Sequence, residues 1–349
     1  MKKINVTIIG VGSFAKALIE GVAFYTKNPK EKTGLMHARI GNYRVQDLNF
    51  VAGFDVDERK VDKKLHTAIY AKPNITKQIS ASLKYNALVH RGPTLDGVID
   101  EIKNSFIQES TELVTDIKKI LKKTKTDVVV NLVPSGSDQA TYLYAEAALS
   151  AGCSFINCIP TPLATVSSWR KKFEKKDLVL LGDDIKSQLG ATMLNRFLLS
   201  LFKMRGIKII ASEQHNKGGN ADHYNLIYRS QTKEKSKKEA LTGFLDKDDA
   251  QPKVTFTYTG KPSGHKEVHL KIEGEIFGRM PIKINSVIED EISINGAGSL
   301  VDAIRVAKFL TDQKKAKEAK NVCAFLMKSP PKTATDTQAL KIFNKILSQ

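Results

Sequence analysis

The chain has 349 residues, of which 41% are hydrophobic, so it can bury a substantial core and is not globally disordered. Its formal net charge of +18 at neutral pH permits binding to nucleic acid or to an anionic membrane. The lysines, however, lie on amphipathic helical stretches without interleaved aromatic residues, so we expect a solvated surface and neither of these partners.

The cysteines and the apolar runs indicate the compartment. Cys153, Cys158 and Cys323 are too few for a disulfide framework and have no zinc-site spacing. Gly10 and Gly12 interrupt the apolar run near the N-terminus, which argues against a signal peptide. No apolar stretch approaches the roughly 18 residues of a membrane-spanning helix. We therefore expect a cytoplasmic protein.

Short apolar strands alternate with helices in the first half of the chain. A β-branched run at residues 4–9 ends in a glycine turn and precedes a stretch with helical spacing of apolar residues. Four more strands are predicted at residues 48–57, 126–134, 153–160 and 178–184. A helix over 137–152 closes on Gly152, and residues 26–47 form a surface excursion. This alternation predicts an α/β fold with a doubly wound parallel sheet.

The pattern changes beyond about residue 205. The predicted strands at residues 207–216, 253–260, 267–278 and 280–290 mostly alternate by twos. Such alternation indicates antiparallel strands with one covered face. From residue 297 the chain is helical again. We predict a discontinuous first domain, residues 1–190 plus 296–349, and an inserted α+β domain at 191–295.

The stretch "GVGSFA" carries a dinucleotide signal directly after the first strand. Gly10, Gly12 and Ala15 fit the pattern G-x-G-x-x-A, which combines a tight turn, close approach to a pyrophosphate and close helix–strand packing. Asp55, at the end of the second strand, is placed to bind ribose hydroxyls and favours NAD over NADP, although Arg59 nearby weakens that preference. The alternative is a glycine turn in a similar fold that binds no nucleotide.

Over roughly residues 4–330, the chain resembles the myo-inositol-1-phosphate synthase (inositol-3-phosphate synthase) family in its short prokaryotic form. The matching stretches agree in order and spacing: "GVGSFAKALIEGV", "FDVDERKV", "RGPTLDG", "NLVPSGSDQATYLYAEAALSAGCSFINCIP", "GDDIKSQLGAT", "GGNADHYNL", "KEKSK", "EDEISINGAGSLVDAIRVAK" and "FLMKSPP". The resemblance implies a Rossmann-type sheet, an inserted α+β domain for catalysis and oligomerisation, and a homotetramer.

The resemblance also implies an activity, the NAD-dependent, redox-neutral conversion of D-glucose 6-phosphate to 1D-myo-inositol 3-phosphate. C5 is oxidised, C6 loses a proton to form an enolate, the enolate attacks the C1 aldehyde, and the C5 ketone is reduced again. NAD must stay bound throughout. The resemblance leaves open whether a divalent metal or a monovalent cation assists; carboxylate and phosphate oxygens would be its ligands.

The family's lysine cluster maps onto Lys233, Lys237, Lys266 and Lys328, in "KEKSK", "SGHKE" and "FLMKSPP". Fixed ammonium groups stabilise charge that develops on oxygen, and a desolvated lysine can move protons. The resemblance implies that Lys233 and Lys328 act near C5. It implies that Lys237 and Lys266 hold the phosphate and stabilise the aldol oxyanion.

The loop "NKGGNADHYNL" matches a G-N-x-D loop of the family. The match implies that Asn220 and Asp222 contact the substrate and that Gly219 lets backbone amides approach its phosphate. The alternative is a Gly-Gly-Asn turn with an aspartate helix cap. Asp290 matches an aspartate that supports the lysines. Here the usual Asp-Ser-Pro is replaced by Asp-Glu-Ile at residues 290–292, so no serine role is assigned.

The stretch "GDDIKSQLGAT" follows the fifth predicted strand. By resemblance, Asp184 faces the nicotinamide and the catalytic lysines, while Ser187 and Gln188 begin a helix whose N-terminus faces the substrate phosphate. An acidic helix cap is the plainer alternative. Further expected NAD contacts lie near the glycine turn and the strand ends: Ser13, Phe14, Asn131, Pro134, Gly136, Ser137, Asn157 and Pro160. Ser137 is equally suited to cap the helix that follows it.

Two other functions stay open at this point. A simple NAD-dependent dehydrogenase of another phosphorylated or acidic substrate would accumulate NADH. A basic nucleic-acid or scaffold protein with a relict nucleotide fold would ignore glucose 6-phosphate and bind nucleic acid with a steep salt dependence. The role of "RGPTLDG" is also open, because Pro-Thr-Leu-Asp-Gly is ordinary turn chemistry.

Overall fold

The structure, a computed structural model, describes residues 3–81, 85–103, 106–229, 231–242 and 245–348. Its first sheet has six parallel strands in the order β3–β2–β1–β4–β5–β6. These strands are β1 (Ile4–Ile9), β2 (Leu48–Asp55), β3 (Val89–Arg91), β4 (Val128–Asn131), β5 (Ser154–Asn157) and β6 (Leu180–Leu181). This order is that of Rossmann-type folds, so the predicted fold class is confirmed.

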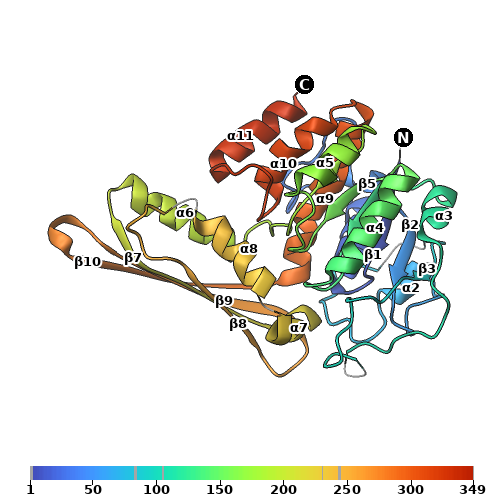
Figure 1. The fold of residues 1–349 in the computed structure, drawn as a ribbon, viewed down its shortest axis with the longest axis horizontal. Coiled ribbons are helices and arrows are strands. Elements are labelled where there is room, and N and C mark those ends of the chain that lie inside the picture. Colours follow the sequence, from blue (N-terminus) through green and yellow to red (C-terminus); the bar gives the residue numbers. More distant parts are fainter. Residues whose placement is uncertain (1–2, 82–84, 104–105, 230, 243–244, 349) are drawn as a thin grey trace.

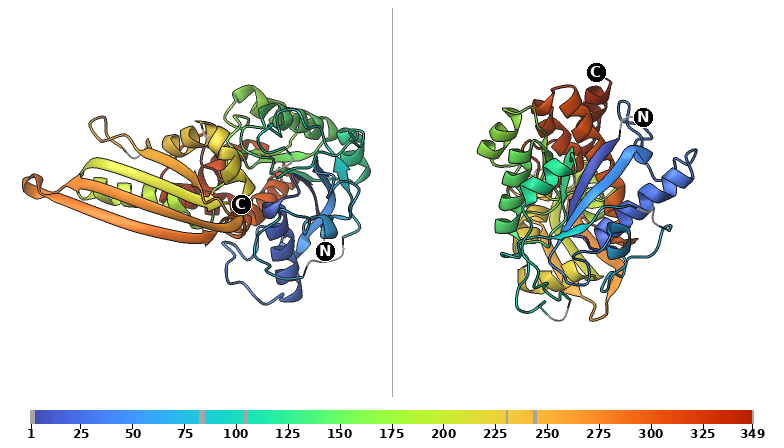
Figure 2. Two further views of the ribbon diagram at one scale, coloured as in Figure 1. Left: turned by 90° about the horizontal axis from the view of Figure 1, so that it is seen from below. Right: turned by 90° about the vertical axis from the view of Figure 1, so that its right-hand side faces the viewer.

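Helices cover both faces of the parallel sheet (Figures 1 and 2). One face packs against α1 (Ser13–Lys27), α9 (Ile292–Asp312), α10 (Ala319–Leu326) and α11 (Asp336–Leu347), and the other against α3 (Ile117–Lys123), α4 (Asp138–Ala151) and α5 (Ser167–Glu174). The core under α1, α9, α10 and α11 is here called the first core, and the core under α3, α4 and α5 the second core. Val128 and Val130 of β4 lie in the first core and Val129 lies in the second, since successive side chains point to opposite faces. The predicted end of α4 at Gly152 is confirmed by that residue's φ of +82°.

The parallel sheet differs from the prediction at its edges. The prediction of five strands missed β3, because its sequence Val-His-Arg has no apolar run. Only Leu180 and Leu181 of the fifth predicted strand join the ladder. The excursion at residues 26–47 is mostly exposed or half-buried, but Ile40 and Tyr43 are buried in the first core. Two short helices, α2 (Leu65–Ala68) and the 3-10 helix η1 (Val45–Asp47), complete this region.

The second sheet has four strands in the order β10–β9–β7–β8. Its region contains β7 (Lys208–Gly219), β8 (Lys253–Tyr258), β9 (Ser263–Glu275), β10 (Pro281–Glu291), α6 (Ala191–Met204), α7 (Ala221–Arg229) and α8 (Gln231–Thr242). Val268, Leu270 and Ile272 alternate with half-buried or exposed residues along β9, as expected for one covered face. The antiparallel prediction is wrong for β8, which runs parallel to β7 because α7 and α8 form a crossover between them.

The second sheet projects from the side of the first, with α6 and α8 along one of its faces (Figure 1). The chain passes to this region after β6 and returns to the parallel sheet through α9. An α+β insertion in a doubly wound fold therefore matches the expectation from the sequence. The division at residues 190/191 and 295/296 stays a prediction.

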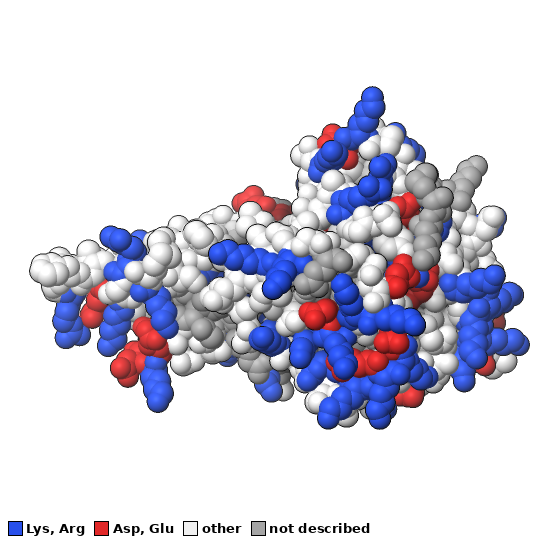
Figure 3. Space-filling view, turned by 90° about the horizontal axis from the view of Figure 1, so that it is seen from above, with Lys and Arg blue, Asp and Glu red and all other residues white. Residues whose placement is uncertain are grey.

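The surface charge is spread over both parts of the molecule. On the face in Figure 3, acidic side chains lie between basic ones over the end that holds the parallel sheet, and basic and acidic side chains also lie toward the far end of the second sheet, behind an uncharged tip. Such interspersed charge is typical of a solvated surface. Among the described residues, no helix is both long and apolar enough to span a membrane.

Candidate active site

A cavity of about 310 Å³, here called the central cavity, lies where the carboxyl ends of the parallel strands meet the second sheet. Its lining combines residues that follow β1, β2 and β4 with residues of α6, α7, α8 and β9. Segments far apart in the sequence therefore meet in one place, which is the position where open α/β sheets bind their ligands.

Gly10 makes the tight turn between β1 and the cavity. It has φ +85°, a left-handed conformation that favours glycine. A Cβ at this position would lie 2.7 Å from the carbonyl oxygen of Leu132, which follows β4. Both observations give the first glycine of the motif its predicted role in the turn.

The N-terminus of α1 is open toward the central cavity. Gly12 is its N-cap, no side chain caps it, and its first turn contains no acidic residue. A Cβ on Gly12 would meet no atom within 4 Å, and Gly12, Ser13 and Phe14 line the cavity. Ala15 is fully buried in the core between helix and sheet, as its packing role requires. These residues fit the pyrophosphate of a dinucleotide.

Asp55 lines the central cavity at the end of β2. Its carboxylate accepts a hydrogen bond from the Val11 amide at 2.8 Å and pairs with the Lys60 ammonium at 3.2 Å. Lys60 also lines the cavity and was missed by the sequence analysis. Arg59, which the sequence suggested as weakening the preference for NAD over NADP, binds Asp57 at 2.8 Å and lies outside the described part of the cavity lining.

The other expected NAD contacts divide into two groups. Pro134 lines the central cavity together with Ser13 and Phe14, whereas a second set lies outside its described lining: Asn131, Gly136, Ser137, Asn157 and Pro160. Asn131 donates to Asn157 at 3.1 Å, and Asn157 donates to Asp183 at 2.9 Å, so these amides cross-link the ends of β4, β5 and β6. Ser137 donates to the Pro134 carbonyl at 2.7 Å. In this geometry their contacts hold loops together.

The segment "RGPTLDG" caps α4. The Asp96 carboxylate accepts hydrogen bonds from the amides of Gln139 at 2.8 Å and Ala140 at 3.1 Å. This carboxylate occupies the helix N-terminus, where a phosphate would otherwise bind. Of these two helices, α1 therefore has the N-terminus that can bind a dinucleotide phosphate, and α4 does not.

Asp184 and Lys328 form an ion pair in the wall of the central cavity. The ammonium of Lys328 lies 2.7 Å from Oδ1 of Asp184, and Ser236 donates to Oδ2 at 3.0 Å. The backbone brings the pair together, since the Lys328 amide donates to the Asp184 carbonyl at 2.7 Å and Ile185 bridges to Met327. Asp184 is nearly fully buried, so its charge needs this partner.

Asp183 has a structural position. It is fully buried, and its carboxylate accepts hydrogen bonds from the amides of Leu163, Ala164 and Thr165 at 3.0–3.1 Å and from Asn157. Burial raises the pKa of the Asp183 carboxyl, and these hydrogen bonds oppose the shift. The two neighbouring aspartates thus have different roles. Asp183 binds the backbone of the loop after β5, and Asp184 lines the cavity.

Three of the four predicted lysines line the central cavity: Lys237 from α8, Lys266 from β9 and Lys328 after α10. Lys237 and Lys266 are buried, and Lys237 donates to Asn216 at 2.6 Å while lying 4.7 Å from the centre of the Phe256 ring. Lys233 lies in α8, but its side chain is outside the described residues. The cavity therefore collects ammonium groups from separate elements beside the Asp184 carboxylate.

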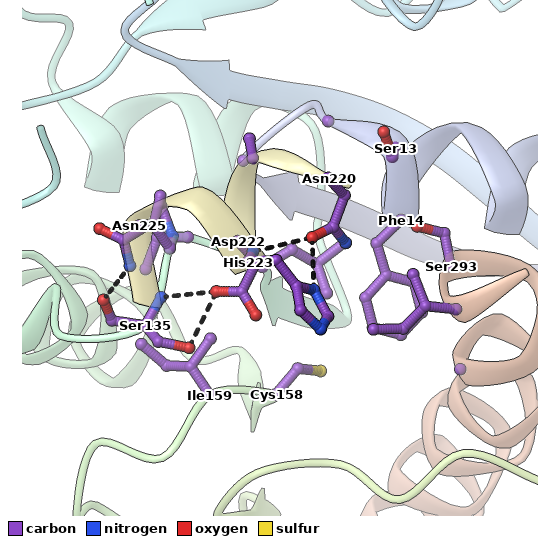
Figure 4. Close-up of a pocket in the computed structure, with 18 of the residues that line it drawn as sticks. Ser13, Phe14, Ser135, Cys158, Ile159, Asn220, Asp222, His223, Asn225 and Ser293 are labelled. Atoms are coloured by element: carbon purple, nitrogen blue, oxygen red, sulfur yellow. Dashed lines mark hydrogen bonds between the residues drawn. The ribbon is translucent and has the colours of Figure 1, made fainter. Parts of the chain in front are cut away.

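Asn220, between β7 and α7, and Asp222, in the first turn of α7, lie at the cavity (Figure 4). Asn220 Oδ1 accepts from the His223 amide and contacts its ring nitrogen Nδ1, both at 2.9 Å, so Asn220, not Asp222, caps α7. Asp222 accepts from the Ser135 hydroxyl at 3.0 Å, and Asn225 donates to the Ser135 carbonyl at 2.9 Å. His223 and Asn225 line the cavity and were missed, because a buried histidine or asparagine is usually structural.

Gln188, Gly219 and Asp290 lie outside the described lining of the central cavity. Gln188 donates to the Gly34 carbonyl at 2.7 Å. A Cβ on Gly219 would collide with the carbonyl of Lys261. The group that lies close to Gly219 is therefore the backbone between β8 and β9, in place of the phosphate that the sequence suggested. Asp290 pairs with Asn295 and lies opposite Lys266 in the ladder between β9 and β10, a position suited to supporting that lysine.

The N-terminus of α6 also meets the central cavity. Gly190 is its N-cap, no side chain caps it, and Ser187, Gly190 and Ala191 line the cavity. Just before it, the buried Lys186 ammonium lies 3.0 Å from Asp336 of α11. Burial lowers the pKa of Lys186 to about 8, while Asp336 acts in the opposite direction. The cavity thus has two uncapped helix N-termini, α1 and α6, which suits a dinucleotide and a second phosphate.

No group of three or more His, Cys, Asp or Glu side chains in the described part of the chain is placed to hold a metal ion. Cys153, Cys158 and Cys323 are buried and form no disulfide bond. The polar groups that line the central cavity are ammonium groups, carboxylates, amides and hydroxyls, together with the His223 imidazole and the Cys158 thiol.

Comparisons with known proteins agree with this geometry. A family model described as myo-inositol-1-phosphate synthase matches residues 190–291. The chain is 39% identical to inositol-3-phosphate synthase of Mycolicibacterium smegmatis, over 97% of this chain and 96% of that protein. It is 38% identical to inositol-3-phosphate synthase of Corynebacterium glutamicum, over 96% of each. A myo-inositol-1-phosphate synthase-related protein from Thermotoga maritima shares the fold, with a TM-score of 0.81, 22% identity and coverage of 99% of this chain and 98% of that one. The chain belongs to the inositol-3-phosphate synthase family.

Proposed function

We propose that this protein catalyses the NAD-dependent, redox-neutral conversion of D-glucose 6-phosphate to 1D-myo-inositol 3-phosphate. One observation carries the proposal: the buried Asp184–Lys328 ion pair lies in the same cavity as the glycine turn that fits a dinucleotide. A hydride acceptor and a proton-transfer pair in one enclosure are what oxidation at C5 followed by loss of a C6 proton requires.

The dinucleotide would be held by Gly10, Gly12 and the amides at the start of α1, with Asp55 near its adenosine ribose. When bound, NAD supplies a reversible hydride acceptor. Pro134 after β4 borders the same space. Because the second sheet closes this space from the other side, the residues of the chain can exclude water while the substrate reacts.

Lys328 is assigned the oxygen at C5. The Asp184–Lys328 pair, 2.7 Å apart, can accept the proton that leaves O5 during the oxidation, and the Lys328 ammonium can then stabilise the charge that develops on this oxygen when C6 loses its proton. Lys233 is proposed to share this task, as the family resemblance implies. A positively charged group at O5 also acidifies the C6 hydrogen, which makes the enolate accessible.

Lys237 and Lys266 are assigned the phosphate and the oxyanion that forms at C1 during ring closure. Both are buried in the cavity wall, where a fixed charge is worth more than in water. Ser187 and the open N-terminus of α6 would bind the phosphate as well, with Gln188 orienting their loop. Asn220 and Asp222 border the substrate space, Gly219 shapes their loop and Asp290 supports Lys266.

Product analysis tests this function directly. Purified protein with glucose 6-phosphate and NAD is expected to form inositol phosphate, measured by NMR, in amounts far above the NAD present and without accumulating NADH. A dehydrogenase of another substrate would instead accumulate NADH in proportion to its product. No inositol phosphate from protein that binds NAD, with several ions tried, would refute the proposal.

We also propose a homotetramer formed through the second sheet region. Phe197 and Met204 on α6 and Phe277 at the β9–β10 turn are 69%, 75% and 99% exposed. Large apolar side chains gathered on one projection mark an interaction surface. Sedimentation analysis at micromolar concentration is expected to give four times the chain mass of 38.6 kDa. A monomeric mass would contradict this assembly.

A further inference from the structure

The adenosine end of the dinucleotide site contains a buried ion pair. Asp55 stands at the end of β2, where a carboxylate normally meets the ribose hydroxyls of NAD. Here the Lys60 ammonium lies 3.2 Å from Asp55 Oδ2, and both side chains are only 7% exposed. Both residues line the central cavity. A nucleotide that enters this end meets a carboxylate whose charge is already paired.

Four hydrogen-bond donors fill the acceptor positions of the Asp55 carboxylate. Oδ1 accepts from the amides of Val56 at 2.8 Å and Asp57 at 3.0 Å, and Oδ2 accepts from the amide of Val11 at 2.8 Å and from Lys60. A carboxylate offers about four acceptor positions. The contact with Lys60 is the longest of these and exceeds the usual charge-assisted distance, so it is the contact that a ligand can exchange most readily.

Arg59 is the other cation on this segment, and the structure gives it a different partner. It binds Asp57 through Nε at 2.8 Å and donates to the Phe106 carbonyl at 2.7 Å. Lys60, in contrast, donates to Asp55, and both residues line the central cavity. A phosphate at the ribose 2′ position would therefore be met by Lys60 and not by Arg59.

We propose that Lys60 determines nucleotide specificity and makes the site accept NADP as well as NAD, an inference that rests on the dinucleotide binding proposed above. A free Asp55 carboxylate would repel a 2′-phosphate, whereas the paired carboxylate does so weakly. The ammonium of Lys60 has three donors, so it can pair with the phosphate while it stays beside Asp55 and keeps that carboxylate paired. For NAD, which lacks the phosphate, the long contact with Lys60 can give way and free Asp55 Oδ2 for a ribose hydroxyl, so both nucleotides find a partner.

Equilibrium binding of NAD and NADP to the full chain, measured by calorimetry without substrate, tests this inference. The wild-type Kd values are expected to agree within about tenfold. Lys60→Met is expected to weaken NADP binding by about tenfold or more and to leave NAD binding within about threefold, since only the 2′-phosphate loses its partner. Lys60→Arg should restore NADP binding. Arg59→Met, the matched control, should leave the ratio of the two Kd values unchanged.

Three results would overturn the inference. NADP binding more than about a hundredfold weaker than NAD binding in the wild type would show that Asp55 still excludes the phosphate. An equal loss of both nucleotides in Lys60→Met, with an unchanged melting temperature, would give Lys60 a general role in the site. Binding of neither nucleotide by the wild type would refute the dinucleotide site itself, and that outcome is distinct from the first two.

Discussion

Replacing Lys328 by methionine is expected to lower kcat by about a thousandfold, because the variant loses the ammonium that meets the developing charge at C5. The side chain lies in the cavity wall, 2.7 Å from Asp184 Oδ1, and also donates to the Ile185 carbonyl at 2.8 Å. NAD binding should persist, since the glycine turn lies between β1 and α1, in a different part of the chain from Lys328. Steady-state kinetics with NMR detection of product, together with NAD calorimetry, measure both effects.

A matched control separates the reaction from folding. Lys332 is an exposed lysine only four residues further along the chain, so Lys332→Met should keep near-normal rates. The melting temperature of Lys328→Met shows whether loss of the ammonium beside the buried Asp184 destabilises the fold, a cost expected to be about 3 kcal/mol or more. Near-normal kcat in a folded Lys328→Met variant would show that this lysine takes no part in the chemistry.

The two glycines of the dinucleotide motif are expected to respond differently to alanine. In Gly12→Ala the new methyl group meets no protein atom within 4 Å, so the melting temperature should not change. That methyl group would occupy the space of the pyrophosphate, and NAD binding should weaken about a hundredfold or more, equivalent to ~2.8 kcal/mol. Calorimetry and thermal unfolding of the same samples measure the two properties.

Gly10→Ala is the contrasting variant. Its Cβ would lie 2.7 Å from the Leu132 carbonyl oxygen, and alanine is strained at φ +85°. The free energy of unfolding should fall by about 2 kcal/mol or more, with NAD binding lost as a consequence. Wild-type NAD affinity in Gly12→Ala would refute the assignment of this turn to the pyrophosphate, whatever the behaviour of Gly10→Ala.

Local patterns in the sequence predicted the parts of the fold that depend on neighbours in the chain. The run before Gly10, the open helix start at Gly12 and the helix end at Gly152 each follow from backbone and spacing rules within a few residues. The strands of the parallel sheet were found where they form apolar runs. The edge strand β3 was missed because Val-His-Arg carries no such run.

Features that depend on distant contacts could not be predicted in this way. The direction of β8 depends on the crossover through α7 and α8 and not on its own alternation. Lys60 was one of many lysines until the structure placed it beside Asp55. Asn157 ends β5 and Ser137 is the N-cap of α4. Amide and hydroxyl side chains serve loops and caps as well as ligands, and here their contacts are with the chain itself.

The most direct test of the proposed reaction is the fate of deuterium at C5 of glucose 6-phosphate. If C5 is oxidised and then reduced again within one closed site, the inositol phosphate formed should keep its deuterium at the carbon derived from C5. Mass spectrometry and NMR of the product measure this retention, with a large excess of unlabelled NADH in solution. Retention with no net NADH is the predicted result. Replacement of the deuterium by hydrogen, or release of deuterated NADH in step with product, would contradict a redox-neutral cyclisation in the central cavity.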